Sequence, residues 1–254
     1  MKHIHFSILP VWIFACAMLS CGKQNTAPGT ASLTLVNAVP GSTPSLVTNF
    51  GGTDPIIWYK NAVKLVYGTW STGNQVGSYS GQQKLAIYRY PDTLAKSTPL
   101  FNLTLDLPVG SIRTLFLTGT LASPDTMFTT DVIPYHPLSD SSISVRFVNL
   151  SPGSNPVSVN ITGGANGSEA GSVAYKNITG FKHYTATATA ASHYNFEFRD
   201  AATGTLLSSY DLTGINNIAS SNTRRFRSFT LAFLGLPTDL TTRKIMMIET
   251  YTSN

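Results

Sequence analysis

The amino-acid sequence predicts an all-β fold of two tandem immunoglobulin-like β-sandwich domains, residues 32–140 and 141–254. Three observations support this prediction. A segment near the start of the chain recurs about half-way along it, and short runs of alternating apolar and polar residues are separated by turn residues. No stretch shows the 3.6-residue periodicity of an amphipathic helix.

The internal repeat joins residues 32–47 to residues 144–159 at an offset of 112, and eight of the sixteen aligned positions are identical. The offset divides the chain after its first thirty residues into two parts of ordinary domain size. A boundary near residue 140 fits the loop-like run of residues 136–142, which is rich in Pro, Ser and Asp.

The shared segment predicts a strand, a kinked crossing and a second strand in each copy. Pro40-Gly41 and Pro152-Gly153 suit the two central positions of a type II turn, because Pro fixes φ and Gly accepts a positive φ. The next Pro of each copy cannot donate to a ladder. Further alternating runs, such as residues 84–90 and 194–199, predict about seven strands per copy.

The run Val145–Asn160 resembles the opening motif of the domain of unknown function 4397 (DUF4397) family. Residues 33–47 resemble a more divergent copy of the same motif. Gly41 and Gly153 stand where the family often has Asp, and Ser158 stands where an acidic residue is frequent. The resemblance implies an extracytoplasmic β-sandwich and no particular activity.

The first residues have the pattern of a secretory signal, residues 1–20, with Lys2 before an apolar stretch too short to span a membrane comfortably. Met18-Leu-Ser-Cys-Gly22 resembles a lipobox, so we expect cleavage before Cys21 and a lipid on this cysteine. Residues 21–31 would form a flexible tether. The prediction is a lipid-anchored protein of the cell envelope, at the outer membrane, with the surface and the periplasmic face both open.

Composition and charge give little support for nucleic-acid binding. Only 11% of the residues are charged, and the formal net charge of +5 is spread along the chain. Nucleic-acid binding needs clustered cations, so it is not expected. The densest basic cluster, residues 224–227, is interpreted as a solvated loop, with lipid phosphates or acidic glycans as the alternative partner.

No catalytic or metal motif is present, and the sequence therefore predicts a protein that is not an enzyme and holds no metal or cofactor. His183 and His193 are expected to flank a hairpin with solvated or strand-face roles, and His136 pairs with no cysteine. Carboxylates are scarce and are expected mostly at turns. The examples are Asp92, Asp125 and Asp140.

Two groups of residues are candidates for a surface role. The aromatic group Trp58, Tyr59, Tyr67 and Trp70 could stack on sugar rings, although alternation puts Trp58 and Tyr59 on opposite faces and favours core packing for at least one. Thr93 and Thr126 follow aspartates in a pattern that resembles an acceptor for periplasmic O-glycosylation.

These observations predict a non-enzymatic cell-envelope module with a binding or structural role, attached to the membrane by its lipid. Its partner would be a glycan or another envelope protein. Three alternatives stay open: a surface glycan-binding protein would show coplanar exposed aromatics, an adhesin or fibre subunit an exchangeable edge strand, and an accessory enzyme three convergent polar side chains in a cleft.

Overall fold

The computed structural model describes residues 29–53, 62–94, 96–219 and 224–252, and it confirms the all-β prediction. Among these residues there is no α-helix, and the short 3-10 helix η2 (Thr72–Asn74) is the sole helical turn. No helix in this part of the chain combines the length and the apolar character that crossing a bilayer requires.

The strands divide into two sets of eight, one from each half of the chain, where the repeat predicted about seven. The N-terminal half contains β1 (Thr30–Asn37), β2 (Leu46–Phe50), β3 (Lys64–Leu65), β4 (Gln75–Tyr79), β5 (Gly81–Arg89), β6 (Phe101–Leu107), β7 (Ile112–Gly119) and β8 (Pro124–Thr130). The C-terminal half contains β9 (Ser142–Asn149), β10 (Val157–Ile161), β11 (Ala170–Val173), β12 (Lys182–Thr185), β13 (His193–Asp200), β14 (Leu206–Thr213), β15 (Arg227–Leu236) and β16 (Asp239–Thr252).

Both halves have the same topology. Each has one sheet of order β4-β1-β7-β8 or β12-β9-β15-β16, and a second of order β3-β2-β5-β6 or β11-β10-β13-β14. The first strand of each half pairs in parallel with the seventh, as β1 does with β7 and β9 with β15, while the other pairings are antiparallel. The sequence repeat therefore extends to strand order and direction.

The residues shared by the two copies build the same turn twice. Asn37 is fully buried, accepts a hydrogen bond from the Val39 amide at 3.1 Å, and donates to the Leu65 carbonyl at 2.9 Å. Asn149 does the same with the Ser151 amide at 3.0 Å and the Val173 carbonyl at 3.1 Å. The presence of Asn at this position in both copies is thus explained by its hydrogen bonds to buried backbone groups rather than by ligand binding.

Gly41 and Gly153 have φ values of +76° and +75°, as the predicted turn requires. A side chain at either position would be strained by this backbone conformation whatever space surrounds it. The family resemblance places an aspartate here, and an aspartate tolerates left-handed backbone less well than glycine. The two glycines therefore fit the local geometry without any functional role.

Each half encloses its own hydrophobic core between its two sheets. In the C-terminal half, Phe147 of β9, Phe196 of β13 and Phe233 of β15 are almost completely buried. In the N-terminal half, aliphatic residues such as Leu35, Leu85 and Leu115 fill the same space. Strand alternation directs these side chains inward, and their burial is the main stabilising term for each half.

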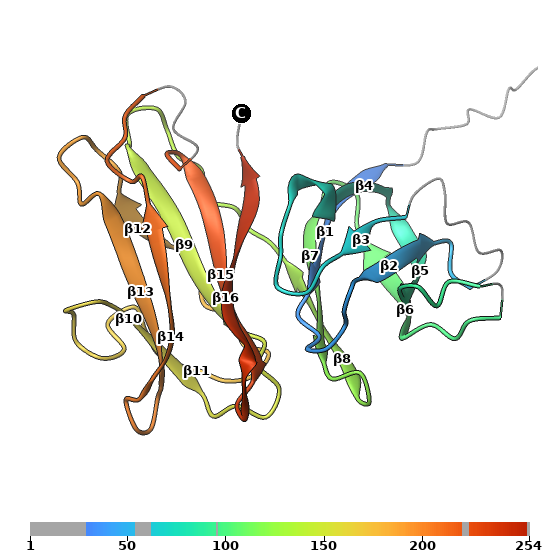
Figure 1. Ribbon diagram of the computed structural model, residues 1–254. Coiled ribbons are helices and arrows are strands. Elements are labelled where there is room, and N and C mark those ends of the chain that lie inside the picture. Colours follow the sequence, from blue (N-terminus) through green and yellow to red (C-terminus); the bar gives the residue numbers. More distant parts are fainter. Residues whose placement is uncertain (1–28, 54–61, 95, 220–223, 253–254) are drawn as a thin grey trace, which may run out of the picture.

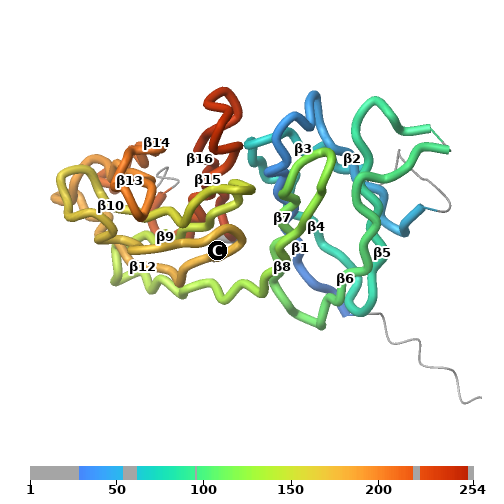
Figure 2. The backbone as a smooth tube through the Cα atoms, turned by 90° about the horizontal axis from the view of Figure 1, so that it is seen from below, coloured from blue at the N-terminus to red at the C-terminus, as the bar shows by residue number. Residues whose placement is uncertain are grey.

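A third apolar cluster joins the two halves, so that four sheets lie one behind another (Figures 1 and 2). Sheet β4-β1-β7-β8 and sheet β12-β9-β15-β16 pack on each other through the faces that are turned away from the core of their own half. The residues that meet there are equivalent in the two copies. They are Val36, Ala38, Phe116 and Met127 from one half, and Val148, Leu150, Ala232 and Met246 from the other.

Polar contacts also join the two halves at this interface. Arg146 of β9 donates to Asp131 Oδ1 at 2.7 Å and to Thr230 Oγ1 at 2.8 Å, and its guanidinium lies 4.6 Å from the ring centroid of Phe181. Asp131 also accepts from Thr114 of β7 at 2.5 Å. The ion pair is buried, with side-chain exposures of 6% for Arg146 and 0% for Asp131.

We expect Asp131→Ala to lower the free energy of unfolding by about 3–5 kcal/mol, because Arg146 would be left charged and unpaired in a buried place. Urea denaturation followed by tryptophan fluorescence measures this change. The control is Lys182→Ala, which removes the exposed pair with Glu169 and should cost under about 1 kcal/mol. Equal effects of the two substitutions would contradict the structural role given to Arg146 and Asp131.

Candidate functional site

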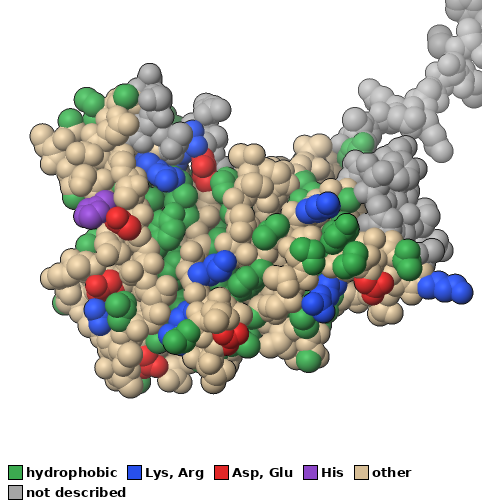
Figure 3. Space-filling model, in the orientation of Figure 1, with side chains coloured by type: hydrophobic (Ala, Val, Ile, Leu, Met, Phe, Trp, Pro, Cys, Tyr) green, Lys and Arg blue, Asp and Glu red, His purple; other side chains and the backbone are tan. Residues whose placement is uncertain are grey.

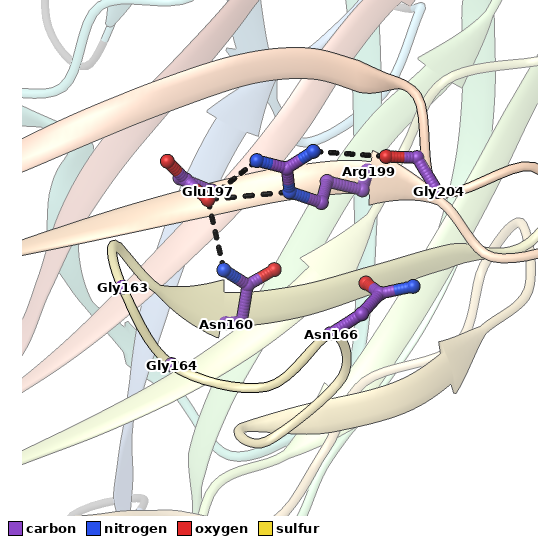
Figure 4. Close-up of a pocket in the computed structure, with 7 residues that line it drawn as sticks. All are labelled: Asn160, Gly163, Gly164, Asn166, Glu197, Arg199 and Gly204. Carbon is purple, nitrogen blue, oxygen red and sulfur yellow. Dashed lines mark hydrogen bonds and ion pairs between the residues drawn. The ribbon is translucent and has the colours of Figure 1, made fainter.

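A polar hollow lies on the outer sheet of the C-terminal half, with a volume of about 370 Å³ (Figure 4). Its side chains come from β10, β13 and the loops beside them. The lining residues are Asn160, Gly163, Gly164, Asn166, Glu197, Arg199 and Gly204. Four of the seven carry planar polar side chains, and none is apolar apart from the glycines, so the hollow suits a ligand rich in hydrogen-bonding groups.

Strand alternation places the polar residues on the outer face. In β13, Phe196 and Phe198 point into the core, so that Glu197 and Arg199 point outward. Asn160 of β10 lies directly opposite Glu197 in the antiparallel register. The alternation of residues 194–199 was visible in the sequence, but the pairing with Asn160 depends on a strand contact across 37 residues.

Glu197 is held by four hydrogen bonds. Its Oε2 accepts from Arg199 Nε at 3.2 Å, from Arg199 Nη2 at 2.8 Å and from Asn160 Nδ2 at 2.8 Å, and its Oε1 accepts from Thr162 at 2.9 Å. Arg199 Nη1 donates to the Gly204 carbonyl at 2.9 Å. The Arg199 hydrogen bond, followed by that of Asn160, holds the pKa of Glu197 below its ordinary value.

Asn160 and Asn166 give the hollow further hydrogen-bonding capacity. Asn160 is 2% exposed, and its Oδ1 has no hydrogen-bond partner among the described residues. Asn166 Oδ1 accepts from Ser158 at 2.9 Å, and Figure 4 shows its amide nitrogen turned away from Asn160. The unpartnered acceptor of Asn160 is thus enclosed beneath the hollow, and the exposed Asn166 supplies an amide donor at its side.

The glycine-rich loop after β10 brings backbone close to these side chains. Gly163 has a φ of +83°, which favours glycine. A Cβ on Gly164 would lie 3.0 Å from the Ile161 carbonyl oxygen, so the loop is too tight for a larger residue without a shift. Because both residues are glycines, this side of the hollow is formed by backbone atoms and no side chain projects into it.

The equivalent positions of β2 and β5 in the N-terminal half do not repeat this polar group. Asn49 is the fourth residue of β2, as Asn160 is of β10, but it pairs with Ala86 of β5 instead of an acidic residue. The position equivalent to Arg199 is Tyr88, which is fully buried. The repeat therefore reproduces the scaffold of the hollow and not its chemistry, which is why the sequence repeat gave no signal for it.

The aromatic candidates divide between two places. Tyr67 and Trp70 are half-buried and pack against the cluster that joins the halves. The Tyr67 hydroxyl donates to the Thr242 carbonyl at 2.6 Å, and Lys244 Nζ lies 5.2 Å from its ring centroid. Both rings thus serve the interface between the halves rather than a free stacking surface. Trp58 and Tyr59 lie outside the described residues, as does Cys21.

The two threonine candidates differ in surroundings. Thr93 lies in a turn after β5 and donates to the Pro91 carbonyl at 3.3 Å. Thr126 lies within β8 opposite the buried Leu117. A modifying enzyme reaches a turn more easily than a paired strand, so this geometry favours Thr93 over Thr126 as an acceptor.

The histidines depart from the expected arrangement. His183 lies on β12 and His193 on β13, and these strands belong to different sheets, so the predicted hairpin between them is wrong. His136 is 4% exposed; its Nδ1 lies 2.9 Å from Ser142 Oγ and its Nε2 lies 3.1 Å from Ser144 Oγ. Burial first, and His183 second, lower its pKa, while Asp140 opposes the shift.

Ser144, His136, Ser142 and Asp140 thus form a continuous hydrogen-bonded chain, since Ser142 donates to Asp140 at 3.0 Å. The chain resembles the relay of a hydrolase in connectivity only. Ser144 is completely buried, so its hydroxyl does not reach a substrate. The polar side chains that the accessory-enzyme alternative requires do converge here, but the nucleophile is enclosed.

Charged side chains elsewhere are mostly partnered. Asp125 lies in β8 rather than at a turn, and it accepts from Lys176 of the C-terminal half at 2.8 Å. In the basic cluster, Arg225 bonds to Ser141 and Arg227 to Glu249, so these two cations are less free than a solvated loop implies. Figure 3 shows both signs of charge scattered over the visible face, without a basic stripe.

No protein-family model matches the chain, and no curated protein shows significant similarity to it. The resemblance of residues 145–160 to the DUF4397 family therefore stays a prediction.

We expect Glu197→Gln to lower the free energy of unfolding by about 1 kcal/mol near neutral pH, because charge-assisted hydrogen bonds would be lost. The folded pKa of Glu197 lies below its ordinary value of 4.5, so its contribution is present above that value and disappears as the pH falls through the folded pKa. Urea denaturation from pH 7 to pH 3 should show the two proteins converging.

The control for this measurement is Asp106→Asn, which changes an exposed carboxylate of β6 that accepts from Gln82 at 3.1 Å. It should alter stability by under about 0.5 kcal/mol at every pH. A gap between wild type and Glu197→Gln that stays constant down to pH 3 would show that the carboxylate charge does not stabilise the hollow.

Proposed function

We propose that this protein is a non-enzymatic binding or structural module of the cell envelope, anchored by a lipid on Cys21. The observation that carries the proposal is the single body formed by the two halves, which places the polar hollow and the start of the folded chain in different halves (Figures 1 and 2). The lipobox-like run that ends at Gly22 and the resemblance to an extracytoplasmic family support the proposed localisation in the cell envelope.

The state of the ionisable groups supports a role other than catalysis. Enzymes that use acid and base groups push paired pKa values apart, and a carboxyl group that acts as a general acid near neutral pH needs a raised pKa. Among the described residues, every carboxyl group with a resolved shift has a lowered pKa. Such shifts come from hydrogen bonds and ion pairs that fix structure.

The position of the hollow supports a binding role. The folded chain begins with β1 in an inner sheet of the N-terminal half, whereas the hollow lies on the outermost sheet of the C-terminal half (Figure 1). A tether at the N-terminus would hold the first half toward the membrane. The interface would then hold the outer sheet in a fixed position relative to the first half, on the side away from the tether's half, where it can meet a partner.

A glycan is the second, more specific candidate for the partner. Asn, Glu and Arg side chains bond sugar hydroxyls through planar groups, and these types line the hollow. The aromatic platform expected of a glycan-binding protein does not include Tyr67 or Trp70, which pack at the interface. The proposal therefore rests on hydrogen bonding in the hollow and not on stacking.

Replacing the cysteine that is proposed to carry the lipid tests the membrane localisation. Wild-type protein should sediment with membranes, and Cys21→Ala should appear in the soluble fraction, because the acyl chains provide the anchoring free energy. Immunoblotting of fractionated cells measures the distribution. Protease added to intact cells, and then to permeabilised cells, distinguishes the surface face from the periplasmic face. Retention of Cys21→Ala in the membrane fraction would refute the anchor.

Co-sedimentation with purified peptidoglycan and with outer-membrane polysaccharide tests the glycan hypothesis. Asn166→Ala should reduce retention about two- to tenfold if the hollow holds sugar hydroxyls, because each lost hydrogen bond costs about 0.5–1.5 kcal/mol. Asn102→Ala on β6, an exposed asparagine on the outer sheet of the other half, is the matched control. Equal retention of both variants would exclude the hollow as the binding site.

A further inference from the structure

Three side chains with metal-binding groups meet where the segment between the halves crosses β9. His136 and Asp140 come from that segment, and His183 comes from β12. One ligand atom from each residue lies within 4.8 Å of the others. The sequence gave no sign of this group, because His183 is 43 residues beyond Asp140 and no His-x-x-x-His spacing is present.

The pairing of β9 with β12 explains why the group assembles. His183 lies directly opposite Ser144 in the antiparallel register, and Ser144 faces the segment that carries His136. Ser144 Oγ is 3.1 Å from His136 Nε2 and 3.5 Å from His183 Nδ1. One oxygen atom is therefore already close to nitrogen atoms of both rings, which stand edge to face at 5.3 Å between centroids.

Ser142 orients two members of the group at once. Its hydroxyl lies 2.9 Å from His136 Nδ1 and donates to Asp140 Oδ2 at 3.0 Å. Metal-binding histidines usually bond through their second nitrogen to a neighbouring group, which fixes the ring and its tautomer. His136 has this kind of support and is buried, whereas Asp140 and His183 are exposed.

We propose that His136, Asp140 and His183 form a binding site for a divalent zinc-type cation. Two imidazole nitrogens beside one carboxylate suit zinc and its neighbours better than calcium or magnesium, which prefer oxygen ligands alone. A tetrahedral zinc ion places its ligand atoms about 3.3 Å apart, given bonds of about 2.0–2.1 Å. The exposed side chains of Asp140 and His183 supply the small closure that this requires.

An ion at this place would cross-link the inter-half segment to an edge strand of the C-terminal half. Both Asp140 and His136 precede β9, and His183 lies on the far strand of its sheet, so the bond would fix the segment against β12. Three protein ligands leave a fourth position for water or for a group from a partner. The site is distinct from the polar hollow, which lies on the other sheet of this half.

Zinc titration of the full chain, purified without a polyhistidine tag, tests this site. Calorimetry should show a site of low-micromolar or tighter Kd that is lost or weakened at least tenfold in His183→Gln and in Asp140→Asn. Both changed residues are exposed, so folding should be retained. The histidines and cysteines outside the site are the same in the wild type and in these two variants, so only the difference between the proteins reports the site.

The matched control is His193→Gln, which changes an exposed histidine on β13 that pairs with Asp211 at 2.9 Å. This variant should bind zinc as the wild type does. Cobalt substitution gives a second readout, because tetrahedral Co²⁺ absorbs visible light, and the band should be absent in His183→Gln. Unchanged zinc binding in both His183→Gln and Asp140→Asn, or the absence of a site with Kd below about 100 µM, would overturn the proposal.

Discussion

The buried ion pair between Arg146 and Asp131 is the constraint on which the arrangement of the two halves depends. Neither charge could be buried alone, because transfer of an unpaired ion out of water costs several kcal/mol. Arg146 belongs to β9, Asp131 follows β8, and Thr114 on β7 and Thr230 on β15 complete their hydrogen bonds. The pair thus requires both inner sheets and the segment between them to be in register with one another.

Around this pair, the two central sheets, β4-β1-β7-β8 and β12-β9-β15-β16, make an apolar contact that buries the faces they turn toward each other. Surface left for partners is then concentrated on the two outermost sheets, on loops and on strand edges. The outer sheet of the C-terminal half combines Asn160, Glu197 and Arg199, while the corresponding positions Asn49, Ala86 and Tyr88 carry no charge. The two halves therefore share a scaffold and differ in the chemistry that they present.

Much of the fold could be predicted from the sequence because its signals are local. The positive φ of Gly41 and Gly153 follows from the Pro-Gly pairs, and the strand at residues 194–199 follows from alternation. Such features depend on a few adjacent residues. Short strands without strong alternation, such as β3 and β11, gave no comparable signal, which accounts for the eighth strand in each half.

The candidate sites could not be predicted, because they depend on contacts between distant residues. Glu197 meets Asn160 only through the β10–β13 register, and His183 meets His136 only after β12 pairs with β9. Tyr67 and Trp70 show the same dependence on distant contacts. The sequence left a ligand surface and core packing both open, and contacts with the other half, such as the bond of Tyr67 to Thr242, favour packing.

Equivalent faces of the two copies meet at the central interface, with Val36 beside Val148 in the same cluster and Met127 alongside Met246. Two separate chains that associated through such matching faces would form a dimer whose population falls on dilution. Joining the copies in one chain replaces that bimolecular step with an intramolecular one of fixed effective concentration. The paired arrangement then does not depend on protein concentration, so even a single molecule would be fully assembled.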